Sequence, residues 1–172
     1  MRHFWVFGYG SLMWRPGFLY TKCESAVLYG AHRSLCVYSH IHRGTPEKPG
    51  LVLGLDQGGT CRGMAFAVAQ EHWDETLTYL REREQATMVY KEANRKVRLA
   101  SGETVDALSY LVDRNHTQYA GRLPLEQQLQ IVTNGHGQSG PNKEYVLNTQ
   151  EHLVSSGTPD KALEWLCTRL KT

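Results

Sequence analysis

The segment FWVFGYGSL, residues 4–12, decides how the rest of the chain is interpreted. Its first four residues are aromatic or β-branched, which predicts a short strand. Gly8 and Gly10 follow at once and predict a tight loop where that strand ends. Because glycine permits a positive φ and a close backbone approach, we expect successive N–H groups of this loop to converge on an anion such as a carboxylate. A plain turn that ends the strand is the alternative.

Outward from this segment, strands come first and helices last. Further strands are expected as two pieces within residues 26–38 separated by a bulge at Gly30, and at 51–55 and 63–68. Strands at 90–99 and 104–112 are expected to form a hairpin joined across Ser101-Gly102. Residues 51–55 and 63–68 are expected to flank a turn at Gly58-Gly59, and the polar residues 39–50 to form a long surface loop. Helices are expected at about 70–83, 125–134, 142–155 and 160–170. This order predicts an α+β fold rather than alternating βαβ units.

Composition narrows the class of protein. The 172 residues are 41% hydrophobic and 21% charged, which predicts one globular domain over residues 1–172. Lys and Arg number 19 against 17 Asp and Glu, a balance too even to indicate nucleic-acid or membrane-surface binding. No apolar run is long enough for a membrane helix or a signal peptide, so we expect a cytoplasmic protein. The four cysteines contain no Cys-x-x-Cys pair and are expected to be reduced, mostly buried thiols.

Several familiar site motifs are absent. A dinucleotide-binding loop would need Gly or Ala where Met13 stands, and no Gly-Lys-Ser/Thr run is present. The Gly-x-Ser-x-Gly motif of serine hydrolases is incomplete around both Ser11 and Ser139. His40 and His42 could supply two metal ligands, but no Cys or carboxylate lies at a suitable spacing, so a solvated loop is expected and no metal is predicted.

The helix expected from residue 70 places one carboxylate on its apolar side. At about 100° per residue, Trp73, Leu77 and Leu80 form one stripe, and the next position on it is Glu84. The opposite face carries Glu71, Glu75, Thr78 and Glu82. We therefore expect Glu82 to face solvent and Glu84 to face inward or the rim of a cavity. Burial raises the pKa of a carboxyl group, which suits a general base or acid near neutral pH. Alternatively, the helix ends before Glu84, which then faces solvent or pairs with a nearby arginine.

Five blocks of sequence resemble the ChaC-type γ-glutamylcyclotransferases, in the order in which that family has them. The blocks are WVFGYGSLMWRPGF at 5–18, YS at 38–39, HRGTPEKPG at 42–50, RE at 83–84 and SGPNKEYVL at 139–147. They span nearly the whole chain. One departure is that bacterial members usually have a glycine after the Arg-Glu pair, where this chain continues QATMVY at 85–90.

The resemblance implies a fold, an activity and a site. It implies a small closed or nearly closed mixed β-barrel flanked by helices, and conversion of glutathione to 5-oxoproline and cysteinylglycine without a cofactor. It implies that Glu84 is the catalytic base and that the loop after the first strand cradles the γ-glutamyl group. The candidate substrate-binding residues of this segment are Val6, Phe7, Gly8, Tyr9, Gly10, Ser11 and Leu12.

Other candidates rest on chemistry alone. Arg43 and Arg33 could each pair with the glycine carboxylate of glutathione, or could simply be solvated. The Tyr145 hydroxyl could bind substrate, or Tyr145 could be a core aromatic residue. Cys36 is assigned no role. Two other functions stay open: the same chemistry on other γ-glutamyl amino acids or amines, and a non-catalytic regulatory role linked to cation transport. No oligomeric state is predicted.

Overall fold

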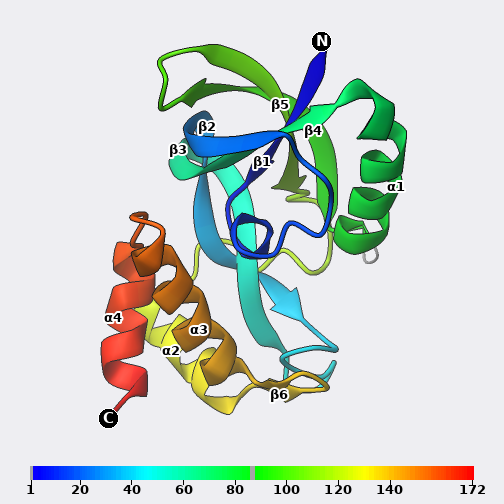
Figure 1. Ribbon diagram of the computed structural model, residues 1–172. Coiled ribbons are helices and arrows are strands. Elements are labelled where there is room, and N and C mark those ends of the chain that lie inside the picture. The colour runs from blue at the N-terminus through cyan, green and yellow to red at the C-terminus, as the bar shows by residue number, and fades with distance from the viewer. Residues whose placement is uncertain (1, 86–87) are drawn as a thin grey trace. The chain divides into compact units, whose positions relative to one another are not determined.

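The computed structural model describes residues 2–85 and 88–172 (Figure 1). The chain forms two compact units, one of Met1–Arg33 and Leu55–Asp113, the other of Ser34–Gly54 and Arg114–Thr172. Each unit is described below in its own terms. Ala86 and Thr87, within the run that departs from the bacterial family pattern, lie outside the described residues.

Five strands close into a barrel with the order β1-β3-β2-β4-β5. The strands are β1 (His3–Gly8), β2 (Lys22–Ser39), β3 (Gly50–Ala69), β4 (Tyr90–Leu99) and β5 (Thr104–Val112). Neighbouring strands pair antiparallel along β1–β3, β2–β4 and β4–β5, whereas β1 pairs parallel with β5 and closes the ring. The predicted α+β fold with a small mixed barrel is therefore confirmed.

Two of the predicted strand boundaries are wrong. The pieces expected within residues 26–38 are one continuous strand, β2, in which Gly30 has a φ of 94°. The pieces expected at 51–55 and 63–68 are likewise one strand, β3, which continues through Gly58-Gly59. Both glycines have positive φ, but they accommodate His32 of β2, whose Nδ1 lies 2.7 Å from the Gly58 carbonyl oxygen. The glycine pair, which in the sequence resembles a turn, therefore lies inside a strand and makes room for His32 of another strand.

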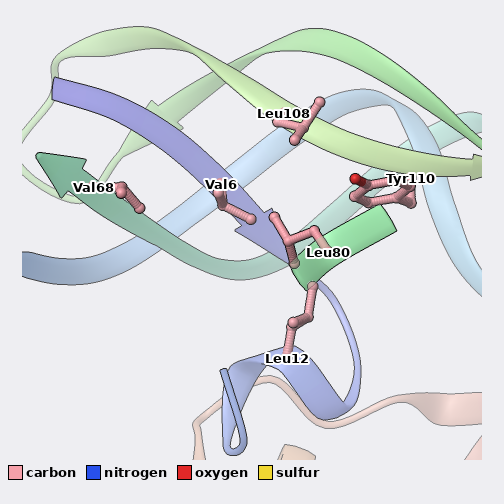
Figure 2. Close-up of a cluster of buried hydrophobic side chains, with 6 residues drawn as sticks. All are labelled: Val6, Leu12, Val68, Leu80, Leu108 and Tyr110. Carbon is pink, nitrogen blue, oxygen red and sulfur yellow. The ribbon is translucent and has the colours of Figure 1, made fainter. Parts of the chain in front are cut away.

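Helix α1 (Trp73–Glu84) follows a short 3-10 turn, η2 (Gln70–His72), and packs its predicted stripe on the barrel core. Leu80 is fully buried, and Trp73 and Leu77 pack against the same core cluster. The faces predicted to be solvated are exposed at Glu71, Glu75, Thr78 and Glu82. Figure 2 shows the buried cluster around Leu80, which consists of Val6, Leu12, Val68, Leu80, Leu108 and Tyr110.

The second unit holds three helices that pack against one another (Figure 1). They are α2 (Leu125–Asn134), α3 (Asn142–Ser155) and α4 (Lys161–Leu170), and the short strands β6 (His136–Gly137) and β7 (Gly140–Pro141) precede α3. Their ends agree with the sequence expectation, except that Asp160 is the N-cap of α4 and accepts a hydrogen bond from Leu163 N at 3.0 Å. Their shared core includes Val132, Val146, Leu153, Leu163 and Leu166.

Asn142 fastens the start of α3 to the beginning of β3. The side chain is fully buried, donates from Nδ2 to Leu51 O and accepts from Leu51 N at Oδ1, both at 2.8 Å. These two bonds imitate a pair of strand hydrogen bonds at a position where no neighbouring strand supplies them. Space is tight there, because a Cβ added at Gly50 or Gly135 would come within 2.9 Å of the Asn142 side chain.

Across residues 2–85 and 88–172, no helix combines the length and the apolar composition that are needed to cross a bilayer.

Candidate active site

The loop after β1 turns sharply into a single 3-10 turn, η1 (Ser11–Met13). The first hydrogen bond of this turn runs from Met13 N to Gly10 O at 2.9 Å. The N–H groups of Gly10, Ser11 and Leu12 precede that bond, so the turn itself offers them no acceptor. Gly10 is buried and Ser11 is exposed, which places this row of N–H groups at the edge of the barrel core.

Gly8 allows close packing of the loop, and neither loop glycine has a left-handed backbone. Neither Gly8 nor Gly10 has a positive φ, so the loop does not use the left-handed conformation that glycine permits. The predicted close approach is present: a Cβ at Gly8 would lie 3.0 Å from Leu12 Cβ and 3.3 Å from Met13 N. A Cβ at Gly63 of β3 would overlap the Gly8 carbonyl oxygen. The chain therefore needs glycine here because the loop folds back onto its own strand.

Arg33 of β2 supports this loop from the barrel. Its Nε donates to Tyr9 O at 2.6 Å and its Nη2 donates to Arg62 O at 2.7 Å. Two backbone carbonyl groups therefore occupy the guanidinium that the sequence left as a partner for a substrate carboxylate. Arg33 therefore stabilises the backbone of the loop at Tyr9.

Glu84 is the last residue of α1 and its side chain is only 16% exposed. Burial raises the pKa of the Glu84 carboxyl, and the positive charge of Arg83 opposes that shift. The predicted contrast with the exposed Glu82 is confirmed, because the helix extends far enough to hold Glu84 on the inward stripe. A poorly solvated carboxylate at the end of a rigid helix is suited to accept a proton from a bound substrate.

Arg83 connects the loop to the end of α1. Its Nη2 donates to Ser11 Oγ at 2.8 Å, and its Nη1 donates to Arg15 O at 2.6 Å. Leu12 and Leu80, one turn before Glu84, also belong to the same buried cluster (Figure 2). Polar contacts of Arg83 and apolar contacts of Leu80 thus attach the loop to the last turns of α1, the helix that ends at Glu84.

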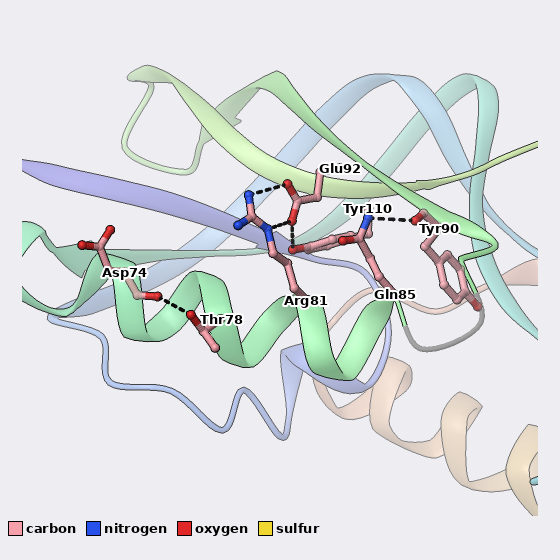
Figure 3. A network of polar contacts seen from close by, with 7 residues as sticks. All are labelled: Asp74, Thr78, Arg81, Gln85, Tyr90, Glu92 and Tyr110. Carbon is pink, nitrogen blue, oxygen red and sulfur yellow. Dashed lines mark hydrogen bonds and ion pairs between the residues drawn. The ribbon is translucent and has the colours of Figure 1, made fainter.

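A second carboxylate lies in a network that the sequence did not reveal (Figure 3). Arg81 donates from Nε to Glu92 Oε1 at 2.7 Å, and the Tyr110 hydroxyl donates to the same oxygen at 3.0 Å. The bond from Arg81 holds the pKa of Glu92 below its usual range, assisted by the bond from Tyr110. Burial raises the pKa of Tyr110, with further contributions from Glu92 and from the charge of Glu84.

The signal for this network was present in the predicted hairpin. Glu92 and Tyr110 are register partners across β4 and β5. A hairpin closed over residues 101 and 102 places them opposite each other, and a carboxylate facing a phenol across two strands forms a hydrogen bond.

In the second unit, the structure brings Arg43 and Tyr145 together. The Arg43 guanidinium carbon lies 5.6 Å from the centre of the Tyr145 ring, and Arg43 Nη1 donates to Pro141 O at 3.1 Å. The Tyr145 hydroxyl accepts a hydrogen bond from Leu53 N at 2.9 Å. The Tyr145 hydroxyl is thus bonded to the backbone, but the residue is only partly buried and is not a core aromatic residue. A role in substrate binding stays a prediction for both Arg43 and Tyr145.

The remaining candidates do not form a metal site. His42 Nδ1 lies 3.0 Å from Ser139 Oγ, which links the polar loop to the segment before α3. No three His, Cys, Asp or Glu side chains gather in a metal-binding arrangement within the part of the chain that the structure describes.

Three of the four cysteines, Cys36, Cys61 and Cys167, are buried, and Cys23 is exposed. This agrees with the expectation that most of the cysteines are buried.

Fold and site together define a class of small α+β proteins. In this chain, a closed five-stranded barrel carries a tight loop after its first strand, and Arg83, next to the shielded carboxylate of Glu84, donates a hydrogen bond to Ser11 of that loop. Within that class, the chain belongs to the ChaC-like protein family, whose family model matches residues 4–172.

Characterised relatives and solved structures agree with this assignment. The chain is 32% identical to the glutathione-specific gamma-glutamylcyclotransferase of Escherichia coli K12, over 97% of this chain and 72% of that protein. It is also 32% identical to the human glutathione-specific gamma-glutamylcyclotransferase 1, over 89% of this chain and 71% of the human protein. A crystal structure of a yeast gamma-glutamyl cyclotransferase specific to glutathione superposes with a TM-score of 0.85 at 23% identity, covering 99% and 98% of the two chains, and so shares the fold.

Proposed function

We propose that this protein is a γ-glutamylcyclotransferase that converts glutathione to 5-oxoproline and cysteinylglycine. The observation that carries the proposal is Glu84, a carboxylate shielded from solvent at the end of α1, whose neighbour Arg83 donates a hydrogen bond to Ser11 in the loop after β1. The names of the bacterial and human relatives support glutathione as the substrate.

Glu84 acts first as a base and then as an acid. The α-ammonium group of the γ-glutamyl unit, whose pKa is about 8 when free, gives a proton to Glu84. The resulting amine attacks the γ-carbonyl carbon of the same molecule and closes a five-membered ring. The amide bond to the cysteine nitrogen then breaks as Glu84 returns its proton to that nitrogen. The second proton of the ring nitrogen passes to the same departing amine, which leaves as an ammonium ion and leaves the lactam neutral. One C–N bond forms and one breaks, so the reaction needs no redox partner.

The loop after β1 binds and orients the γ-glutamyl unit. The N–H groups of Gly10, Ser11 and Leu12 are candidates to bind its α-carboxylate and to stabilise the developing oxyanion. The rest of the segment, from Val6 to Tyr9, forms the buried support of this loop. Holding one molecule in a bent conformer with amine and carbonyl in contact can contribute several kcal/mol to the rate.

We further propose that Arg43 binds the terminal carboxylate of glutathione. Arg43 donates one hydrogen bond from Nη1 to Pro141 O. A guanidinium has five N–H donors, so this bond still allows the side chain to bind a carboxylate. Arg43→Met should raise KM for glutathione about 10-fold and leave KM for γ-glutamyl-ethylamide, which lacks that carboxylate, unchanged. Equal effects on the two substrates would exclude this role. Lys48→Met, in the same exposed loop, is the matched control.

The proposed reaction is tested by incubating the purified protein with glutathione and with γ-glutamyl-alanine and measuring 5-oxoproline. We expect release from glutathione. Release from γ-glutamyl-alanine alone would identify the enzyme as a cyclotransferase of other γ-glutamyl compounds. A folded protein that releases 5-oxoproline from neither substrate would favour a non-catalytic role.

A further inference from the structure

We propose that Arg83 is a positioning residue that fixes the loop after β1 at a set place relative to the Glu84 carboxylate. The inference rests on the proposed function and deepens it, because it names the residue that holds the binding loop and the proposed base in register. The contacts that carry it all lie within the barrel unit.

Arg83 directs its hydrogen bonds to the loop. Besides Ser11 Oγ and Arg15 O, its Nη1 donates to Pro16 O at 3.3 Å. Ser11 is the first residue of the turn η1, and Arg15 and Pro16 lie just after the turn ends. A planar guanidinium with two terminal nitrogens can serve acceptors several residues apart at once, which a lysine ammonium cannot do in the same geometry. We call Arg83 with these acceptors the Arg83 clamp.

The same side chain leaves the neighbouring carboxylate available. Arg83 Nε lies 3.7 Å from Glu84 Oε1, which is beyond hydrogen-bond range. The positive charge is therefore close enough to act on Glu84 electrostatically without occupying its oxygens. A base that had to break an arginine hydrogen bond before accepting a proton would be slower, because that bond stabilises its ionised form.

Tyr79 orients the guanidinium from the preceding turn of α1. Arg83 Nη1 also donates to the Tyr79 hydroxyl at 3.0 Å. That hydroxyl packs directly on Gly17, where an added Cβ would overlap it and where φ is +76°. Glycine is needed at position 17 both for this backbone conformation and for this contact. The clamp thus extends from Ser11 to Gly17 and holds the whole turn against α1.

Two substitutions at one position separate the charge of Arg83 from its shape. Arg83→Lys keeps the positive charge beside Glu84 but cannot span the loop acceptors. Arg83→Met removes both. Arg98→Met, which replaces an exposed arginine on β4, is the matched control.

We expect kcat/KM for glutathione to fall about 10- to 100-fold in Arg83→Lys through a raised KM, because the loop loses its fixed position. The acid limb of its pH–rate profile should stay at the wild-type pH. In Arg83→Met the same loss should be accompanied by an acid limb moved to higher pH, because the positive charge that lowers the pKa of Glu84 is gone. Tyr110 of β5 also interacts electrostatically with Glu84, but its phenol is neutral in this pH range and does not replace that charge. An Arg83→Lys variant with wild-type KM would overturn the proposal.

A second measurement needs no substrate. Amide hydrogen exchange of Met13 and Arg15, whose N–H groups donate to Gly10 O and Ser11 O, should be faster in both Arg83 variants than in wild type and Arg98→Met, since these bonds open more often without the clamp. Unchanged exchange in both variants would also overturn the proposal. A wild-type protein that is inactive on glutathione would refute the proposed function, and the exchange result would then decide the clamp by itself.

Discussion

The Tyr110 hydroxyl donates a hydrogen bond to Glu92 Oε1 at 3.0 Å across the β4–β5 hairpin. This bond and the ion pair with Arg81 keep Glu92 ionised, and its pKa is lowered. Burial shifts the pKa of Glu84 in the opposite direction. The pKa values of two carboxylates in one barrel unit are therefore shifted in opposite directions, and of these two Glu84 is the better suited to accept a proton from a substrate.

The first prediction compares two glutamates on one helix. Glu84→Gln should lower kcat for 5-oxoproline release at least about 1,000-fold, because the amide cannot accept the proton, while the fold and binding of 5-oxoproline persist. Glu82→Gln changes an exposed carboxylate two residues away and should retain wild-type kcat. Full activity in Glu84→Gln would refute the mechanism, and a severe loss in Glu82→Gln would reverse the assignment of helix faces.

The second prediction concerns pH and activity. A general base works only when it is ionised, so kcat/KM should fall as pH decreases through the pKa of Glu84. Because burial raises that pKa, the fall should be centred above the ordinary glutamate value of about 4.3. A pH–rate profile of the wild-type protein measures this directly. An acid limb centred at or below the ordinary value would show that the group responsible is a solvated carboxylate.

The third prediction concerns the stability cost of Glu84. With a raised native pKa, the folded state binds this proton more tightly than the unfolded chain, so the associated stability is present below about pH 4.3 and is lost as pH rises through the native value. Glu84→Gln should therefore be more stable than wild type at pH 7, and the two should converge below about pH 4. Urea unfolding at both pH values tests this, with Glu82→Gln expected to match wild type.

The fourth prediction has the opposite sign and concerns Glu92. Its native pKa is lowered, so its contribution to stability is present above the unfolded-state pKa and disappears as pH falls through the native value. Glu92→Gln should destabilise the protein at pH 7, by less than about 1 kcal/mol because the partner Arg81 is largely solvated. The difference should vanish in acid. A Glu92→Gln variant that is as stable as wild type at pH 7 would show that the network contributes nothing measurable.

The fifth prediction concerns the second unit. Asn142→Ala removes both bonds to the Leu51 backbone and leaves a buried N–H and C=O without their partner, at a cost of about 2–4 kcal/mol. Asn148→Ala, at an exposed position on the same helix, should cost less than about 0.5 kcal/mol. Thermal unfolding followed by far-UV circular dichroism compares the two. Similar midpoints for both variants would mean that the Asn142 bonds are replaced by water.

Periodicity predicted the parts of this structure that depend on neighbours along the chain. The hairpin of β4 and β5, the ends of α2 and α3, and the different orientations of Glu82 and Glu84 all follow from local spacing. The continuity of β3 could not be predicted in this way, because Gly58 and Gly59 adapt to His32 on another strand.

In the candidate site, too, local features were predicted from the sequence and long-range contacts were not. Its carboxylate was found from a helical stripe, which is a local pattern. Arg33 donates to Tyr9 O, 24 residues away along the chain, and Arg83 donates to Arg15 O, 68 residues away. No rule of sequence spacing predicts such distant hydrogen bonds. The pairing of Glu92 with Tyr110 lies between these cases, since it requires only the register of a correctly predicted hairpin.

The adjacency of Arg83 and Glu84 on α1 has a consequence for how this chain can change in length. One residue inserted between Trp73 and Arg83 would rotate everything after it by about 100°, turning the clamp away from Ser11 and the carboxylate away from the barrel in a single step. An insertion at the exposed turn of Ser101 and Gly102 would change neither. Length variation among functional descendants of this sequence is therefore expected at the hairpin tip and excluded from α1.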